Sequence, residues 1–225
     1  MTSYKLAPSI LSADFAELGR EVARIEPFAD LLHIDAMDGH FVPPITIGPV
    51  IVQSLRRVTD LPLECHLMVT EPLAQAEQFA EAGGTSVIVH LEAAPDPAPI
   101  VARARALGIG VGLSLNPETP LDAVLPWLET IDVLNVMTVH PGWAGQAFLD
   151  SMLPKIEAAR AAIDERSLDV GLAVDGGINL ATGKQALDAG ATTLGAASAI
   201  FGASDPAEAA RELRALLRSY AGASA

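Results

Sequence analysis

The first predicted strand of this 225-residue chain ends in the stretch Ala7-Pro-Ser-Ile-Leu-Ser-Ala-Asp14. A doubly wound open sheet, one of two folds to be distinguished, normally has a glycine-rich turn after its first strand. This stretch contains no glycine, and Asp14 followed by Glu17 is instead typical of the beginning of a helix. The segment therefore favours the other fold of alternating strands and helices, a closed barrel.

The rest of the chain alternates apolar, β-branched runs with segments of helical period. The runs are almost continuously apolar, as expected for strands buried on both faces of a parallel sheet. They predict eight strands, at residues 4–10, 31–37, 63–68, 86–91, 110–115, 133–139, 170–174 and 193–197. Eight helix-like segments alternate strictly with them, among them residues 72–82, 99–107, 149–165 and 206–219. This order predicts an α/β fold, a single (β/α)8 TIM barrel.

The composition limits the classes of protein to which the chain can belong. Its length suits one barrel of roughly 200–250 residues, so we predict a single domain over residues 1–225 with a frayed tail from Ala221. Fourteen Lys and Arg against 28 Asp and Glu leave a net charge of −14, which argues against nucleic acid or an anionic membrane as a partner. The single cysteine, Cys65, excludes an internal disulfide. Without a secretory signal or an apolar stretch of roughly 18 residues, we expect a cytoplasmic protein.

Most histidines fall where a barrel carries its active site, at the carboxyl ends of the strands. In a strand, residues i, i+2 and i+4 share one face, so His33, Asp35 and Met37 are expected to point the same way. Burial of an ionised aspartate beside a histidine is costly unless a divalent cation pairs with both. A simple His–Asp hydrogen bond inside the barrel is the alternative. The histidines at issue are His33, His66, His90 and His140 in or at the ends of predicted strands, with His40 in the loop after the second.

A mixed nitrogen–oxygen metal site can be assembled from three of these strand ends. His33, Asp35, His66 and Asp175 could together supply its ligands. Imidazole and carboxylate suit Zn²⁺, and also divalent iron, manganese or cobalt. Spacing along the chain cannot establish the site, because the strands are far apart in sequence.

Small-residue loops follow the last three predicted strands, at residues 141–146, 175–177 and 196–199. Backbone N–H groups in such turns can bind an anion without lysine or arginine, and barrels often bind phosphate after strands 7 and 8. The alternative is that the glycines merely permit tight turns. Met37, Met68 and Met137 lie on strands near the same end and could line a reacting centre, although methionine on a strand is usually core filler.

Seven segments of the chain resemble ribulose-phosphate 3-epimerases, in family order between Ala7 and Phe201. They are Ala7-Pro-Ser-Ile-Leu-Ser-Ala-Asp14, His33-Ile-Asp-Ala-Met-Asp-Gly-His-Phe-Val-Pro43, His66-Leu-Met-Val69, Leu115-Asn-Pro-Glu-Thr-Pro120, Pro141-Gly-Trp-Ala-Gly-Gln146, Val174-Asp-Gly-Gly177 and Ser198-Ala-Ile-Phe201.

The resemblance implies a metal-dependent isomerase of the pentose phosphate pathway. It would interconvert D-ribulose 5-phosphate and D-xylulose 5-phosphate by two-base proton transfer at C3, through a metal-stabilised enediolate. Asp35 and Asp175 would be the acid/base groups, and one divalent ion would be held by His33, Asp35, His66 and Asp175. Ser9 and His66 would contact the sugar. The phosphate would be surrounded by Gly142, Trp143, Ala144, Gly145, Gly176, Gly177, Ala197 and Ser198. The family also implies a homo-oligomer, a dimer or a hexamer.

Several positions depart from the family's usual pattern: Pro44, His140, Trp143, Ala144 and Ala197. Alanine in place of glycine retains the N–H group only if the backbone there does not require a positive φ. The departures leave a hexulose-6-phosphate (allulose 6-phosphate) 3-epimerase as the nearest alternative.

Two further classes are less favoured. Schiff-base aldolases and the related decarboxylases need a lysine at the strand ends, but Lys5 lies at the start of the first strand and Lys155 and Lys184 on predicted helices. A non-catalytic phosphosugar-binding barrel would not need both Asp35 and Asp175.

Overall fold

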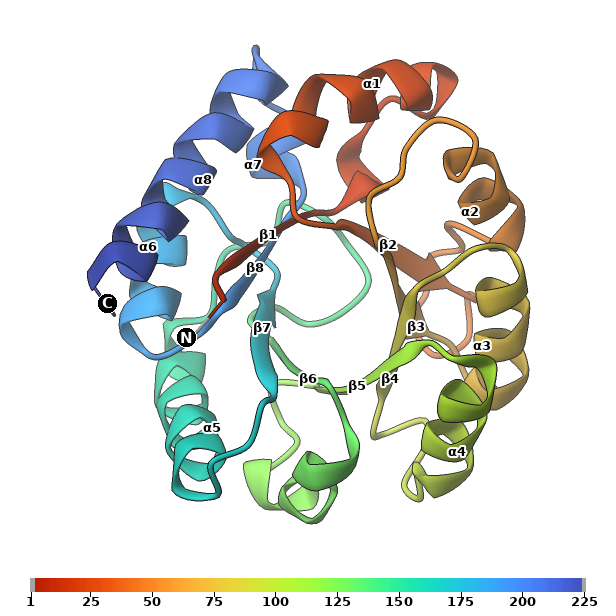
Figure 1. Ribbon diagram of the computed structural model, residues 1–225, viewed down its shortest axis with the longest axis vertical. Coiled ribbons are helices and arrows are strands. Elements are labelled where there is room, and N and C mark those ends of the chain that lie inside the picture. Colours follow the sequence, from red (N-terminus) through yellow and green to blue (C-terminus); the bar gives the residue numbers. More distant parts are fainter. Residues whose placement is uncertain (1–2, 224–225) are drawn as a thin grey trace.

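The structure, a computed structural model, describes residues 3–223, and its eight strands form one parallel sheet. The sheet has the order β1-β8-β7-β6-β5-β4-β3-β2, and a parallel bridge between Ser9 and His33 brings β1 beside β2. It therefore closes on itself (Figure 1), which confirms the predicted barrel. The strands are β1 (Lys5–Pro8), β2 (Leu32–Met37), β3 (Leu63–Met68), β4 (Ser86–His90), β5 (Gly110–Leu115), β6 (Val133–Met137), β7 (Gly171–Asp175) and β8 (Thr193–Ala196).

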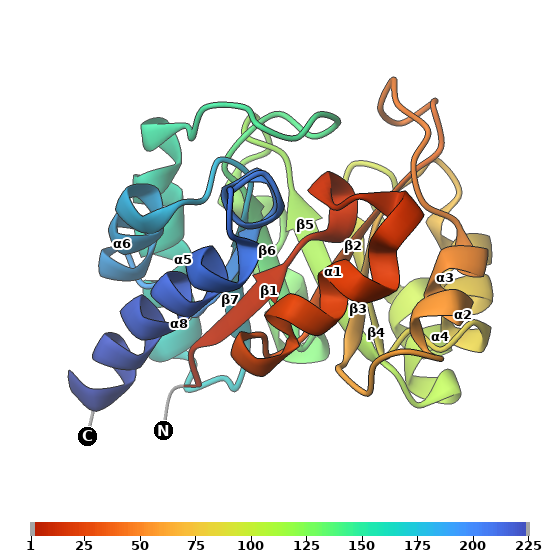
Figure 2. The ribbon, with the colours of Figure 1, turned by 90° about the horizontal axis from the view of Figure 1, so that it is seen from above.

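Helices lie outside the closed sheet and cover its outer face (Figures 1 and 2). Their bounds are α1 (Leu18–Ile25), α2 (Pro49–Leu55), α3 (Pro72–Glu81), α4 (Ala98–Leu107), α5 (Leu153–Glu165), α6 (Leu180–Asp188), α7 (Ser198–Phe201) and α8 (Pro206–Ala223). The last helix therefore continues two residues past Ala221, where we predicted a frayed tail, and residues 224–225 lie outside the described residues.

The alternation of strands and α-helices is interrupted between β5 and β6. Two 3-10 helices, η4 (Leu121–Ala123) and η5 (Leu125–Thr130), occupy this segment instead of the expected α-helix. Pro117, Pro120 and Pro126 each lack the amide hydrogen that a helix interior requires, which limits the segment to short turns.

The start of the first helix also differs in detail from the expected cap. The Asp14 carboxylate accepts a hydrogen bond from the Ala16 amide at 2.9 Å, which begins a 3-10 turn over residues Phe15–Glu17. The α-helix starts only at Leu18, so Glu17 is its cap residue and does not complete a capping box.

Strand ends agree with the prediction at β3 and β5 and differ elsewhere by one or two residues. The largest differences are at β1 and β6. Strand β1 stops at Pro8 because Ser9 begins a 3-10 turn, in which its hydroxyl accepts from the Leu11 amide. Strand β6 stops at Met137, and the next hydroxyl, on Thr138, donates to the Gly176 carbonyl at 2.6 Å.

The two faces of the sheet differ in chemistry. On β2, Leu32 and Ile34 belong to the apolar core between sheet and helices, whereas His33 and Asp35 point into the barrel. Polar side chains are buried inside the barrel on several strands and at the end of β1: Ser9, His33, Asp35, Glu64, His66, His90, Ser114 and Asn135. The outer apolar layer thus holds the barrel together, and its interior is free to carry polar chemistry.

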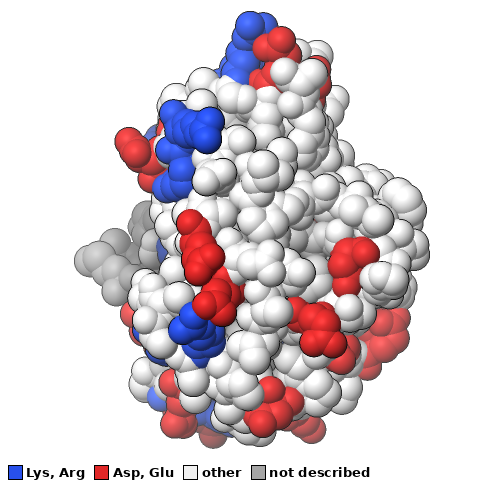
Figure 3. Space-filling model, turned by 90° about the vertical axis from the view of Figure 1, so that its right-hand side faces the viewer, with Lys and Arg blue, Asp and Glu red and all other residues white. Residues whose placement is uncertain are grey.

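Charged side chains are dispersed over the face of the molecule that lies on the right in Figure 1. Figure 3 shows acidic and basic groups interspersed there among uncharged atoms, with no continuous basic patch on this face. Among the described residues, no helix combines the length and apolar character needed to cross a membrane.

The apolar layer makes a stability prediction. Phe79 on α3 is almost completely buried, whereas Leu73 on the same helix is 42% exposed. We expect Phe79→Ala to lower the free energy of unfolding by about 3–5 kcal/mol, because it leaves a cavity beneath the helix. Leu73→Ala is the matched control, with an expected loss below about 1 kcal/mol. Urea denaturation followed by circular dichroism measures both, and equal losses would contradict this packing.

Candidate active site and metal centre

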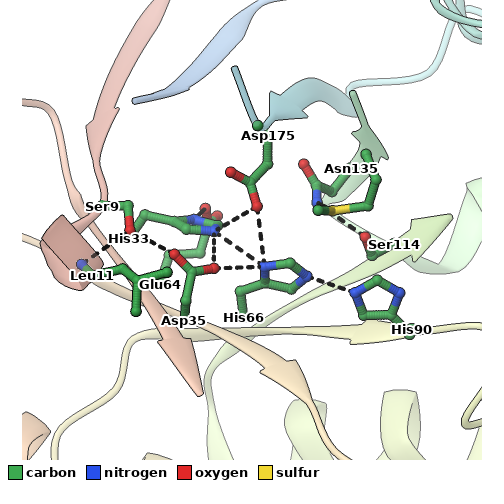
Figure 4. A network of polar contacts seen from close by, with 12 residues as sticks. Ser9, Leu11, His33, Asp35, Glu64, His66, His90, Ser114, Asn135 and Asp175 are labelled. Carbon is green, nitrogen blue, oxygen red and sulfur yellow. Dashed lines mark hydrogen bonds and ion pairs between the residues drawn. The ribbon is translucent and has the colours of Figure 1, made fainter. Parts of the chain in front are cut away.

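Four predicted ligands converge at the carboxyl-terminal end of the barrel (Figure 4). His33 and Asp35 come from β2, His66 from β3, and Asp175 ends β7. Asp35 and His66 are partners in the β2–β3 register, so parallel pairing alone sets them side by side. One ligand atom from each residue lies within 4.8 Å of every other, which makes the group able to hold a metal ion.

The ligand atoms face a common point. Oδ1 of Asp35 lies 2.9 Å from Nδ1 of His66 and 3.3 Å from Nε2 of His33. Oδ2 of Asp175 lies 3.3 Å and 3.6 Å from the same two nitrogens. The two nitrogens are themselves 3.3 Å apart. The chain thus presents two imidazole nitrogens and two carboxylate oxygens, a donor set suited to a divalent transition metal.

The electrostatics of the cluster also fit a cation. Burial by itself raises the pKa of Asp35, but the neighbouring imidazoles outweigh it and hold that pKa far below its usual value. Burial and the charge of Asp35 both oppose ionisation of Asp175, yet hydrogen bonds from the same histidines leave its pKa lowered.

The histidines show the reverse balance. Burial lowers the pKa of His33 and His66, and the carboxylates raise both above the usual value. Among the described residues, no lysine or arginine makes an ion pair with Asp35 or Asp175. Protons on the imidazoles and a divalent cation are therefore the alternative sources of positive charge for these two carboxylates.

Two further side chains hold the ligands in place. Oε1 of Glu64 lies 3.1 Å from Nδ1 of His33, on the side of the ring away from the cluster. The Ser9 hydroxyl donates to Oδ2 of Asp35 at 2.5 Å. Glu64 is absent from our sequence-based prediction, although it shares the face of His66 at the i−2 position of an otherwise apolar strand. A buried charge at that position was the available signal.

A pocket adjoins the cluster, and most of the predicted site residues line it. Ser9, His33 and His66 are buried and do not line it. The pocket also includes five residues that sequence reasoning missed: Leu11, Val139, Pro141, Ile178 and Gly195. Its predicted lining residues are Asp35, Met37, Met68, Met137, Gly142, Trp143, Ala144, Gly145, Asp175, Gly176, Gly177, Ala197 and Ser198. The structure thus brings the predicted residues together, and their individual roles stay predictions.

The small-residue loops have the backbone conformations that the sequence suggested. Gly177 has φ +68°, and a Cβ atom there would lie 2.5 Å from the backbone nitrogen of Phe148, so only glycine fits. Ala144 and Ala197 have no positive φ, since Ser167 is the one such non-glycine residue in the described chain. Alanine at both positions is therefore compatible with exposed backbone N–H groups.

The departures from the family pattern lie mostly at the rim. Trp143 lines the pocket and is 64% exposed. His140 does not line it; its Nε2 lies 2.6 Å from Oε1 of Glu118 in the loop after β5. None of the lysines lines the pocket either, and Lys155 donates to backbone carbonyls outside it. A Schiff-base reaction in this pocket thus has no lysine to use.

Residues 5–201 match the model of the ribulose-phosphate 3 epimerase family. The chain is 46% identical over 212 residues to a ribulose-phosphate 3-epimerase of Bacillus subtilis (strain 168), with 93% of this chain and 98% of that protein covered. It is 43% identical over 222 residues to the chloroplastic ribulose-5-phosphate-3-epimerase of Arabidopsis thaliana, with 96% of this chain and 78% of that protein covered.

Solved structures resemble the chain in fold. A 3-hexulose-6-phosphate synthase superposes with a TM-score of 0.73 at 22% identity, covering 95% of this chain and 99% of that one. KGPDC from Streptococcus mutans gives a TM-score of 0.72 at 18% identity, with 97% of this chain and 99% of that one covered. At these identities the likeness concerns the barrel alone.

The cluster predicts one bound divalent ion per chain. We expect protein stripped with a chelator and reloaded with Zn²⁺ or Co²⁺ to bind one ion, measured by equilibrium dialysis and elemental analysis. His33→Ala removes one of the four donors and should weaken binding at least about tenfold. His140→Ala changes an exposed histidine outside the cluster and serves as the control. Undiminished binding by His33→Ala would contradict this assignment.

Proposed function

This chain belongs to the ribulose-phosphate 3-epimerase family, and we propose that it interconverts D-ribulose 5-phosphate and D-xylulose 5-phosphate with Asp35 and Asp175 as acid and base. It is an isomerase, a ribulose-phosphate 3-epimerase. One observation carries the proposed mechanism: two carboxylates, the buried Asp35 from β2 and the partly buried Asp175 from β7, face the same point and line the same pocket.

Inversion at C3 requires a proton to leave one face of the sugar and another to arrive on the opposite face. Asp35 and Asp175 come from strands on different sides of the cluster, so a substrate between them has one carboxylate toward each face. We assign Asp35 as the base that removes the proton α to the C2 carbonyl. Asp175, from a strand on the other side of the cluster, is assigned as the acid that delivers a proton to the opposite face, and the roles reverse in the back reaction.

His33, Asp35, His66 and Asp175 would hold the divalent ion, for which we propose zinc, with iron, manganese and cobalt suited to the same donors. When bound, it would supply Lewis-acid stabilisation of the negative charge that develops on the substrate oxygens. Glu64 and Ser9 orient His33 and Asp35 for this task.

The rest of the pocket binds and shields the substrate in this proposal. Three methionines line the pocket and exclude water from the reacting carbon: Met37, Met68 and Met137. The family resemblance also assigns Ser9 and His66 to the sugar; neither lines the pocket, and both make hydrogen bonds to Asp35, which does. Backbone N–H groups hold the phosphate, because no lysine or arginine lines the pocket. They belong to Gly142, Trp143, Ala144, Gly145, Gly176, Gly177, Ala197 and Ser198.

A hexulose-6-phosphate 3-epimerase is the alternative that specific residues favour. Trp143 and Ala144, in the loop after β6, line the pocket. The ring of Pro44, in the loop after β2, lies next to Gly142 of that loop. These departures from the family pattern meet where they can alter the length of sugar that fits.

We further propose that residues 1–225 act as one domain in a cytoplasmic homo-oligomer, a dimer or hexamer, with no nucleic acid or membrane partner.

Isotope exchange distinguishes the substrates. We expect metal-loaded protein incubated with ribulose 5-phosphate in D2O to give xylulose 5-phosphate with deuterium at C3, followed by NMR, because the proton removed exchanges with solvent. Exchange with a hexulose 6-phosphate alone would favour the alternative. Exchange with neither sugar would contradict the epimerase assignment and leave a binding role.

The acid/base assignment predicts a selective loss of turnover. Asp175→Asn cannot deliver a proton, so kcat should fall about 10²–10⁴-fold at saturating metal while the circular dichroism spectrum stays that of the folded barrel. Asp188→Asn is the matched control, since that carboxylate pairs with Lys184 on the surface of α6. Turnover of Asp175→Asn within tenfold of the unsubstituted protein would exclude Asp175 as an acid/base group.

A further inference from the structure

A chain of hydrogen bonds leads from His66 away from the metal cluster (Figure 4). While Nδ1 of His66 faces the cluster, its Nε2 lies 2.8 Å from Nε2 of His90 on β4. Nδ1 of His90 in turn lies 3.3 Å from Oε2 of Glu92, just beyond the end of that strand. Both rings are completely buried and stack with centroids 4.9 Å apart. The metal cluster is thus connected through the barrel interior to a carboxylate on its far side.

Ligation of a metal fixes the direction of every hydrogen bond in this chain. If Nδ1 of His66 binds the ion, the only proton of that neutral ring is on Nε2. The Nε2–H group of His66 must therefore donate to Nε2 of His90, which is the acceptor. His90 then carries its own proton on Nδ1 and donates it to the Glu92 carboxylate. Each step has one donor and one acceptor, so all three side chains are satisfied at once.

Glu92 is held firmly enough to act as the anchor of the chain. The other carboxylate oxygen of Glu92, Oε1, accepts a hydrogen bond from the backbone N–H of Asn116 at 2.8 Å and another from the Thr119 hydroxyl. Burial raises the pKa of Glu92, but hydrogen bonds from His90, Thr119 and the Asn116 amide outweigh it and lower the pKa to about 2. The group is therefore an ionised acceptor whose position is set by the loop after β5.

That loop is fixed in turn by Lys155, which reaches it from α5. The ammonium group donates to the carbonyl oxygens of Asn116, Pro117 and Thr119 at 3.1, 2.7 and 2.8 Å. Three backbone acceptors on one ammonium hold the turn in a single shape. The segment 115–120 is one of those that carried the family resemblance, and the proposed reaction gives it no task.

We propose that His90, Glu92 and Lys155 are positioning residues that orient His66, through the loop 116–119, so that its Nδ1 points at the metal. The proposal rests on the proposed metal centre. It explains why two ligands are supported differently: a carboxylate contacts His33 directly, whereas His66 reaches its carboxylate through a second imidazole. Partners of this kind commonly contribute 10–100-fold, roughly, to metal affinity.

The tautomers provide the first test. In full-length, zinc-loaded protein labelled with ¹⁵N-histidine, long-range ¹H–¹⁵N NMR should show His66 protonated on Nε2 and His90 protonated on Nδ1. The signals are assigned by comparison with His90→Gln and His140→Ala. Protonation of His90 on Nε2 would overturn the proposal, because the hydrogen bonds would then run in the opposite direction.

Metal affinity provides the second test, by competition with a chromophoric chelator for Zn²⁺. His90→Leu removes the acceptor for His66, and its zinc affinity should fall about 10–100-fold. His90→Gln places an amide oxygen near the position of Nε2 and should restore most of that loss. Lys155→Met, far from the ion, should weaken zinc binding in the same direction by a smaller factor.

A merely structural role gives a different pattern. It would lower the melting temperature of the metal-free protein and leave zinc affinity unchanged, which would overturn the proposal. Ser114→Ala, on the strand position beside His90 but outside the chain of hydrogen bonds, is the matched control and should bind zinc normally. If His90→Leu does not fold, the proposal is still tested by the zinc affinities of His90→Gln and Lys155→Met and by the tautomers of the two histidines. Failure of the unsubstituted protein to bind zinc would instead contradict the metal centre itself.

Discussion

Two carboxylates with oxygens within 4.8 Å of each other, one group buried and one partly buried, are the constraint around which the interior of this barrel is organised. Asp35 and Asp175 would each be costly to ionise in an apolar interior, and together they repel. Histidines supply the compensating contacts, since no lysine or arginine of the described residues makes an ion pair with either carboxylate. Those histidines need partners of their own, and the polar contacts that follow extend across strands β1 to β4.

Such an interior is possible because the barrel does not depend on it for stability. The apolar residues that face outward from the strands form one large core with the surrounding helices. Inside, adjacent strands with fixed register set the distance between groups, as for Asp35 and His66 on β2 and β3. The strands form a rigid framework, and the side chains and loops at their carboxyl ends can vary. This separation lets one fold support many reactions.

The sequence predicted most of this arrangement where local rules suffice. The i, i+2 rule placed His33 and Asp35 on one face, and apolar runs located every strand. The proximity of Asp175 to the other ligands depends on closure of the barrel. The sequence predicted it only from the position of Asp175 at the end of a strand and from the family resemblance. The prediction of a helix between β5 and β6 was wrong because three prolines limit that segment to turns. Glu64 obeys the same i, i+2 rule beside His66 on β3 and could have been found by applying it to every histidine, whereas Glu92 lies in the turn after β4, where the rule does not hold.

The order of the ligands along the chain has a consequence for biosynthesis. His33, Asp35 and His66 are made early, but the fourth donor ends β7, after most of the polypeptide has been synthesised. The complete donor set cannot exist before the chain has been made as far as Asp175, so capture of an ion by all four donors would be coupled to the late steps of assembly. A bound ion would tie the amino-terminal strands to a late one, as a cross-link does, and a product truncated before Asp175 lacks the fourth donor.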